Sequence, residues 1–87
     1  MIFEFTDNAL ADLEYGKKHD STKIVKIKAL LENIMQTPYM GIGKPEPLRF
    51  DFADYWSRRI DREHRLVYKV DDDTATVFAC RFLHYES

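Results

Sequence analysis

A break in the pattern of the chain at residues 37–47 most constrains its fold. Thr37 precedes Pro38, and proline disfavours helical backbone in the residue before it, so a helix is expected to end there. Residues that favour loops follow at short intervals, namely Gly41, Gly43, Pro45 and Pro47. Apolar residues recur with the helical period before this break and with the strand period after it. The break therefore separates a helical half from a β half.

The half before the break predicts a short strand and two helices. Residues 2–5 favour a strand, and the N-cap signal at Thr6-Asp7 starts a helix that is expected to run to about Lys18. A second helix is expected from about Thr22 to Gln36. Its apolar residues recur at steps of three, four and three, at Ile24, Ile27, Leu31 and Ile34. The short polar link between the two helices predicts an antiparallel hairpin.

The half after the break predicts three antiparallel strands. They are expected from Tyr55 to Ile60, from Arg65 to Val70 and from Thr74 to about Leu83, with tight turns between them. The predicted class is α+β, with the two helices packed on one face of a mainly antiparallel four-stranded sheet, in the order β-α-α-β-β-β. The other face is expected to be open, and residues 1–87 are expected to form a single domain.

Composition limits the compartment and the cofactors. The lone Cys80 cannot form an internal disulfide or build a zinc site by itself, and it reads as a core residue. The first ten residues lack the pattern of a signal peptide, and no apolar run is long enough to span a bilayer. We therefore expect a cytoplasmic protein with no membrane association, no metal and no cofactor.

The distribution of charge is more informative than its sum. A net charge of −2 disfavours a generic nucleic-acid-binding protein, which would usually be basic. Residues 44–69, however, hold seven Lys and Arg against five Asp and Glu, and five of the seven are Arg. The planar fork of arginine suits phosphate. These counts predict that a polyanion would be held at one local site.

Three side chains in the second half could perform acid–base or electrostatic chemistry. Glu46 lies between Pro45 and Pro47, so its carboxylate is either a general base on a stiff arm or a solvated surface charge. Arg65 is either a phosphate ligand on the open sheet face or a solvated strand residue. His84 follows an apolar strand, although a histidine near a chain end is usually uninformative.

Together these groups match the chemistry of RNA cleavage through the 2′-hydroxyl. A base removes the 2′-OH proton, cations stabilise the crowded phosphate, and an acid protonates the departing 5′-oxygen. The sequence shows no Gly-rich phosphate loop, no paired metal-binding carboxylates and no G-x-S-x-G motif. A metal-independent mechanism is therefore expected.

Four sequence blocks resemble the YoeB/Txe toxins of the RelE superfamily. They are GKPEPL at 43–48, YWSRRI at 55–60, EHRLVYKV at 63–70, and ACR followed by HY within 79–85. The order and spacing of these blocks agree with that family, and the weaker N-terminal pattern agrees too. The resemblance thus covers nearly the whole chain.

The resemblance implies a toxin that cleaves mRNA in the ribosomal A site and is restrained by a cognate YefM/Axe-like antitoxin. Operator DNA would be bound only through that antitoxin, and a homodimer is allowed because some family members form one. By similarity, Glu46 is the general base, Arg65 stabilises the transition-state phosphate and His84 is the general acid. Tyr85 lies beside the substrate. The residues that place the RNA backbone are Lys44, Arg49 and Arg59.

The chain departs from the family pattern at three places. Arg49 stands where the family usually has lysine. Both Phe82 and Leu83 precede His84, one residue more than usual, and in a regular strand this would turn the histidine to the opposite face unless a β-bulge absorbs it. The Glu86-Ser87 extension adds a carboxylate near the end.

Two other hypotheses compete with the toxin enzyme. One is a RelE-fold protein whose cleavage is weak or lost, which would act mainly by binding its antitoxin or DNA. The other is an unrelated small α+β interaction domain whose arginine-rich strands contact an acidic protein. The order of the four blocks favours the toxin family over this last hypothesis.

The small local excess of positive charge generates a prediction about the substrate. Few phosphates can be neutralised by so few cations, so ribosomal contacts are expected to supply much of the affinity. Free RNA should therefore be cleaved poorly compared with mRNA on ribosomes, which a gel assay at moderate salt would measure. Efficient cleavage of naked RNA under those conditions would contradict the prediction.

Overall fold

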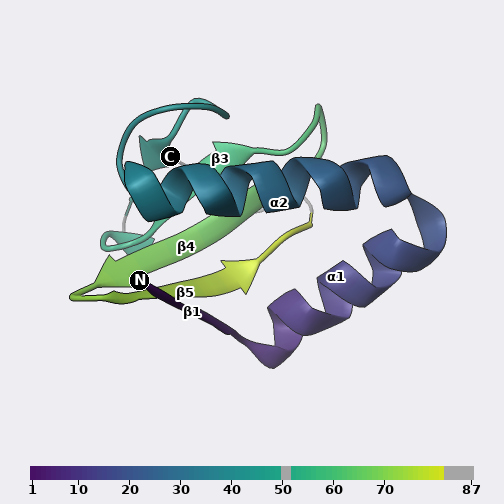
Figure 1. The fold of residues 1–87 in the computed structure, drawn as a ribbon, viewed down its shortest axis with the longest axis horizontal. Helices are drawn as coiled ribbons and strands as arrows, with labels where there is room; N and C mark the ends of the chain where they lie inside the picture. Colours follow the sequence, from purple (N-terminus) through teal and green to yellow (C-terminus); the bar gives the residue numbers. More distant parts are fainter. Residues whose placement is uncertain (50–51, 82–87) are drawn as a thin grey trace.

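The computed structural model of the chain describes residues 1–49 and 52–81. Figure 1 shows two helices and a sheet, whose elements are β1 Ile2–Phe5, α1 Asp7–His19, α2 Ser21–Gln36, β2 Glu46–Pro47, β3 Trp56–Arg59, β4 Arg65–Asp71 and β5 Thr74–Ala79. The α+β class is confirmed. The predicted strand number was one too low, because Glu46–Pro47 forms a two-residue strand where a loop was expected.

Two capping residues explain the helix boundaries. The Thr6 hydroxyl accepts a hydrogen bond from the Ala9 backbone N–H at 3.1 Å and so begins α1. Asp20 ends α1 by donating its N–H to the Gly16 carbonyl at 2.7 Å, and its carboxylate accepts from the Lys23 N–H at the start of α2. One residue therefore ends one helix and caps the next, which produces the predicted short link.

The sheet has the order β1-β5-β4-β3-β2. β1 runs parallel to β5, and the other neighbouring strands are antiparallel. β2 is held to β3 because Glu46 pairs with Ser57 and Pro47 with Trp56. The edge strand β2 is thus the last strand of the sheet and lies next to β3.

The helices cover one face of this sheet. Leu66, Tyr68 and Val70 of β4 pack against them, in a core that includes the α2 residues Ile27, Leu30 and Ile34. In Figure 1, α1 leads away from the end of β1, and α2 turns back and lies across the sheet. Trp56 of β3 is partly buried and packs against the same cluster.

The opposite face is less open than expected. Leu48, Val67 and Ala79 are buried there in a second cluster, against which Phe52, Tyr55 and Phe78 pack. The three aromatic rings contact one another, and the ring centroids of each pair are 5.7 Å apart. The polar residues described below lie beside this cluster, on β2, β3 and the start of β4.

β5 ends earlier than predicted. Val67 pairs with Ala79 while Tyr68 pairs with Val77, so Phe78 is the extra residue of a β-bulge. Just after the strand, the backbone N–H of Cys80 donates to the carboxylate of Asp12 in α1 at 3.0 Å. A side chain of α1 therefore supplies the acceptor for this N–H in place of a neighbouring strand. The strand ends at Ala79, not at about Leu83, a position that lies outside the described residues.

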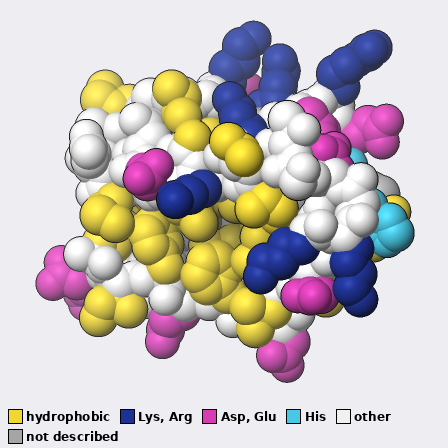
Figure 2. Space-filling view, turned by 45° about the vertical axis from the view of Figure 1, so that its right-hand side comes forward, with side chains coloured by type: hydrophobic (Ala, Val, Ile, Leu, Met, Phe, Trp, Pro, Cys, Tyr) yellow, Lys and Arg dark blue, Asp and Glu magenta, His cyan; other side chains and the backbone are white. Residues whose placement is uncertain are grey.

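The surface of the helical side is mixed. Figure 2 shows apolar side chains over much of the middle and left of the visible face, with Lys and Arg side chains at the top and right and a few among the apolar ones. Leu10, Val25 and Met35 are among the exposed apolar residues of the two helices. Within the described part of the chain, neither helix has the length and apolar character needed to cross a membrane.

The buried Cys80 thiol predicts a loss of stability at alkaline pH. Burial, and then the nearby Asp12 carboxylate, raise the pKa of Cys80 from 9.0 to about 12. Above pH 9 the thiol ionises in the unfolded chain but stays protonated in the folded protein, so the free energy of unfolding should fall by about 1 kcal/mol by pH 10. Denaturant titrations of the wild type and Cys80→Ala from pH 8 to 10 would measure it.

The alanine variant provides the control for this effect. Its absolute stability is expected to be lower at every pH because a buried side chain has been truncated. Its slope with pH should nevertheless be shallower than that of the wild type. Equal slopes in the two proteins would show that the thiol makes no pH-dependent contribution.

Candidate active site

Three strands place a set of polar side chains on the sheet face opposite the helices. Glu46 of β2 lies beside Ser57 of β3, and Arg59 at the end of β3 lies beside Arg65 at the start of β4. Alternate residues of a strand point to opposite faces, so Ser57 and Arg59 share a face from which Arg58 points away. Arg59 and Arg65, which pair across β3 and β4, therefore project from the same side of the sheet.

Arg65 is held rigidly in this set. Its Nε donates to the Ser57 hydroxyl at 2.9 Å, and its Nη2 lies 3.4 Å from both the Ser57 and the Lys44 carbonyl oxygens. Nη2 is also 3.8 Å from Oε2 of Glu46. The Arg65 side chain is 11% exposed and that of Glu46 is 47% exposed. A fixed cation therefore lies beside a carboxylate that solvent and a ligand can reach.

Burial and two charged neighbours act on the pKa of Arg65, and their net effect is to lower it. Burial lowers the pKa of the Arg65 guanidinium, the Glu46 carboxylate raises it, and the neighbouring Arg59 lowers it. An arginine remains protonated in proteins even when its pKa is lowered. The site thus holds a permanent positive charge with little water around it, and such a charge acts strongly on a developing anion.

The structure brings some of the other predicted residues to this pair. The backbone of Lys44 has a positive φ of 50°, and its carbonyl oxygen contacts Arg65. Arg59 is exposed, and its N–H donates to the Gly43 carbonyl at 2.6 Å. Arg49 is exposed, and among the described contacts none joins its side chain to Glu46 or Arg65.

The predicted residues His84 and Tyr85 lie outside the described residues. Their roles as general acid and as substrate neighbour therefore stay predictions. His64 lies in the β3–β4 turn, where its N–H donates to the Asp61 carboxylate at 2.8 Å.

Sequence reasoning missed two residues that organise the site. Ser57 is 1% exposed and accepts the hydrogen bond of Arg65, although no role of its own had been predicted for it from the sequence. Arg58 is 0% exposed, although it is one of the seven Lys and Arg of residues 44–69 from which a polyanion site was predicted. The alternation of Trp56, Arg58 and Ile60 was the signal that could have placed Arg58 on the buried face.

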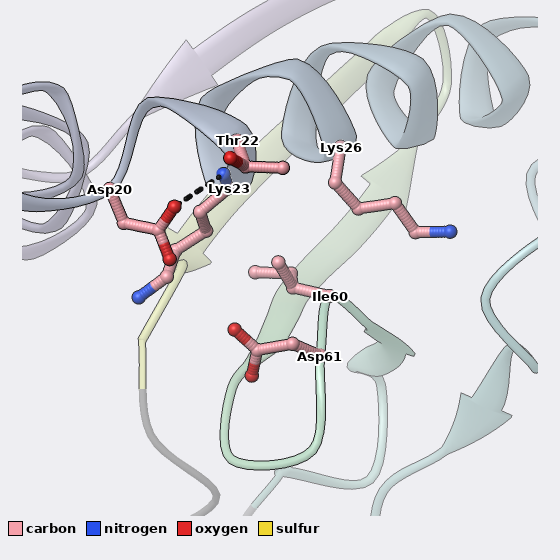
Figure 3. Close-up of a pocket in the computed structure, with 6 residues that line it drawn as sticks. All are labelled: Asp20, Thr22, Lys23, Lys26, Ile60 and Asp61. Carbon is pink, nitrogen blue, oxygen red and sulfur yellow. Dashed lines mark hydrogen bonds between the residues drawn. The ribbon is translucent and has the colours of Figure 1, made fainter.

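A separate cavity of about 300 Å³ lies between the start of α2 and the turn that follows β3. Figure 3 shows its lining residues, Asp20, Thr22, Lys23, Lys26, Ile60 and Asp61. Lys23 and Lys26 extend in opposite directions, and two aspartates share the lining, so the cavity does not present a converging anion site. Within residues 1–49 and 52–81, no group of three or more His, Cys, Asp or Glu is arranged to hold a metal ion.

Fold and site together define a small α+β protein with an arginine–glutamate pair on an open sheet face. Residues 5–85 match the family described as the YoeB-like toxin of bacterial type II toxin–antitoxin systems. The chain therefore belongs to the YoeB-like toxin family.

Individual proteins support this assignment. The chain is 42% identical to the toxin YoeB of Escherichia coli K12 over 81 residues, which are 93% of this chain and 95% of that protein. A YoeB/ParE toxin structure from Agrobacterium tumefaciens is 42% identical, with a TM-score of 0.94, and the match covers 97% of this chain and 100% of that one. YoeB in a heterotetrameric YoeB–YefM toxin–antitoxin complex from Staphylococcus aureus is 38% identical, with a TM-score of 0.89 and coverage of 97% and 98%.

The hydrogen bond between Ser57 and Arg65 generates a stability prediction. Ser57→Ala leaves the buried Nε of Arg65 without its 2.9 Å acceptor, which should lower the free energy of unfolding by about 1–3 kcal/mol. Urea denaturation measures the change. Ser21→Ala removes an exposed serine at the start of α2 and should change stability by only about 0.5 kcal/mol. Equal effects of the two substitutions would show that the Ser57 hydroxyl does not support Arg65.

Proposed function

We propose that this single-domain toxin is a cytoplasmic, metal-independent endoribonuclease that cuts mRNA on the ribosome and so inhibits translation. The observation that carries the proposal is the buried guanidinium of Arg65, fixed 3.8 Å from the exposed carboxylate of Glu46. A permanent cation beside an accessible base supplies two of the three functions that 2′-hydroxyl cleavage requires. The local excess of arginine in residues 44–69 supports a polyanionic substrate.

The proposed reaction starts at Glu46. Its carboxylate takes the proton of the RNA 2′-hydroxyl, and the 2′-oxygen forms a bond to the adjacent phosphorus. Arg65 stabilises the negative charge that builds on the phosphate oxygens. The bond from phosphorus to the 5′-oxygen then breaks, His84 donates a proton to that oxygen, and a 2′,3′-cyclic phosphate and a 5′-hydroxyl result.

The remaining residues of the proposal bind and orient RNA. Lys44, Arg49 and Arg59 would hold the backbone, and the exposure of Arg49 and Arg59 is compatible with that role. Tyr85 would lie against the substrate. Arg58 is excluded from direct contact with RNA because its side chain is fully buried.

The proposed partners are an antitoxin and the ribosome. The YoeB–YefM complex of Staphylococcus aureus supports a YefM-like antitoxin as the protein that restrains this chain. An antitoxin that covers the Glu46–Arg65 face would block substrate entry. Operator DNA would be contacted through the antitoxin, and a homodimer of the free toxin stays a prediction.

The catalytic proposal is tested with substitutions that change one function each. Glu46→Gln removes the base, Arg65→Lys removes the fork held by Ser57, and His84→Gln removes the acid. Each should slow cleavage of ribosome-bound mRNA by about 100-fold or more, measured by mapping cut sites and growth after induction.

Two exposed residues of the β3–β4 turn provide matched controls. Glu63→Gln and Arg62→Lys make the same chemical changes away from the site and should retain the wild-type rate. A wild type that neither slows growth nor cuts translated mRNA would contradict the enzyme proposal. Full activity of His84→Gln would instead contradict only the assignment of the acid.

A further inference from the structure

The buried side chain of Arg58 makes an unusual set of hydrogen bonds. Its three nitrogens donate to five oxygens, namely Tyr68 Oη at 3.1 Å, Asn33 Oδ1, and the carbonyls of Ile42 at 3.1 Å, Thr37 at 2.6 Å and Met40 at 3.1 Å. All five oxygens are neutral. The charge is therefore stabilised by oriented dipoles, and a buried charge is tolerated only when such bonds satisfy it.

Most of these oxygens belong to one segment, residues 37–43, which we name the 37–43 loop. Three of its carbonyls converge on Arg58. The Tyr68 hydroxyl, which accepts from Arg58, donates in turn to the Pro38 carbonyl at 2.6 Å. Asn33 accepts from both Arg58 and the Ile42 N–H. The conformation of the loop is thus set largely around a single guanidinium.

The loop leads directly into the candidate active site. The Gly43 carbonyl accepts from the Arg59 N–H, and the next carbonyl, that of Lys44, contacts Arg65. Gly43 has a φ of 80°, and a Cβ there would lie 2.7 Å from Leu30 and 3.1 Å from the Arg58 Cβ. Pro45 then restricts the backbone before Glu46. The path from Arg58 to the carboxylate is short and stiff.

We propose that Arg58 is a positioning residue: through the 37–43 loop it fixes Lys44 and Glu46 against Arg65. The inference rests on the proposed function where it concerns cleavage, but its geometric part concerns the protein alone. Arg58 lies on the face opposite Ser57 and Arg59 and is fully buried, so it acts on the reaction only through the loop.

Arg58→Lys separates geometry from charge. Lysine keeps the positive charge but presents one nitrogen with three donors, so it cannot bond five oxygens spread around a planar fork. Asn33→Ala is a second variant that favours the α2 helix and removes the acceptor shared by Arg58 and Ile42. If Arg58→Lys does not fold, Asn33→Ala still tests whether the hydrogen bonds around Arg58 position the loop. Glu32→Ala, at an exposed neighbouring position of α2, is the control.

The chain contains its own reporter of loop docking. Tyr39 of the loop stacks on Trp56, with ring centroids 4.9 Å apart, and the sequence has one tryptophan. Trp56 fluorescence and near-UV circular dichroism therefore report the position of the loop below the unfolding transition. NMR signals of the Glu46 carboxyl carbon and the Arg65 Nε–H report the site without any RNA.

Three results are expected for the Arg58→Lys variant. The Trp56 signal should change, the Glu46 and Arg65 signals should shift, and single-turnover cleavage on the ribosome should slow by about 100-fold with unchanged dependence on toxin concentration. Asn33→Ala should change the same quantities in the same direction, with cleavage slower by about tenfold. Glu32→Ala should behave as the wild type. A loss of stability alone would leave all these signals of the folded protein unchanged.

Two outcomes would overturn the inference. One is a displaced loop signal with unmoved Glu46 and Arg65 signals and a wild-type cleavage rate. The other is slower cleavage without any change at the loop or at Glu46. If the wild type itself cuts no translated mRNA, the proposed function fails, and the positioning role is then decided by the Glu46 and Arg65 signals alone.

Discussion

The burial of the Arg58 guanidinium is the constraint on which the rest of the structure depends. A charge inside a small domain must be surrounded by hydrogen-bond acceptors, and here the acceptors are supplied by α2, β4 and the 37–43 loop. The same residue thus ties a helix end, a core strand and a glycine-rich loop together. Because the loop continues into Glu46, the demand for acceptors around one buried cation also determines where the candidate base lies.

β4 connects the core with the site. Leu66 and Tyr68 point to the helices, while Arg65 and Val67 point to the opposite face. Because side chains alternate along β4, the residue that follows Arg65, Leu66, already belongs to the hydrophobic core on the other face. The short spacing limits how far Arg65 can move, and the Ser57 hydroxyl on β3 fixes its direction. Rigid support of this kind suits a site that stabilises charge in a transition state.

The predictions failed where distant segments decide the local structure. Glu46–Pro47 has no strand pattern of its own, and it becomes β2 only because β3 offers a partner. β5 was predicted to continue because its apolar pattern continues, but a bulge at Phe78 and the Asp12 carboxylate end it. Arg58 was counted among the seven Lys and Arg of residues 44–69 that predicted a site for a polyanion. Arginine is rarely buried, and only a loop that folds over Arg58 makes its burial tolerable.

The sequence by itself determined the two capped helices, the β half and the family, since local periodicity, capping residues and ordered blocks carry that information. It also identified Glu46, Arg59 and Arg65 as candidates. Only the tertiary structure decided that Glu46 lies 3.8 Å from Arg65, that Ser57 holds Arg65, and that Arg58 is internal. The reason is physical: each of these facts depends on contacts between segments that are separated in sequence, and no local pattern records such contacts.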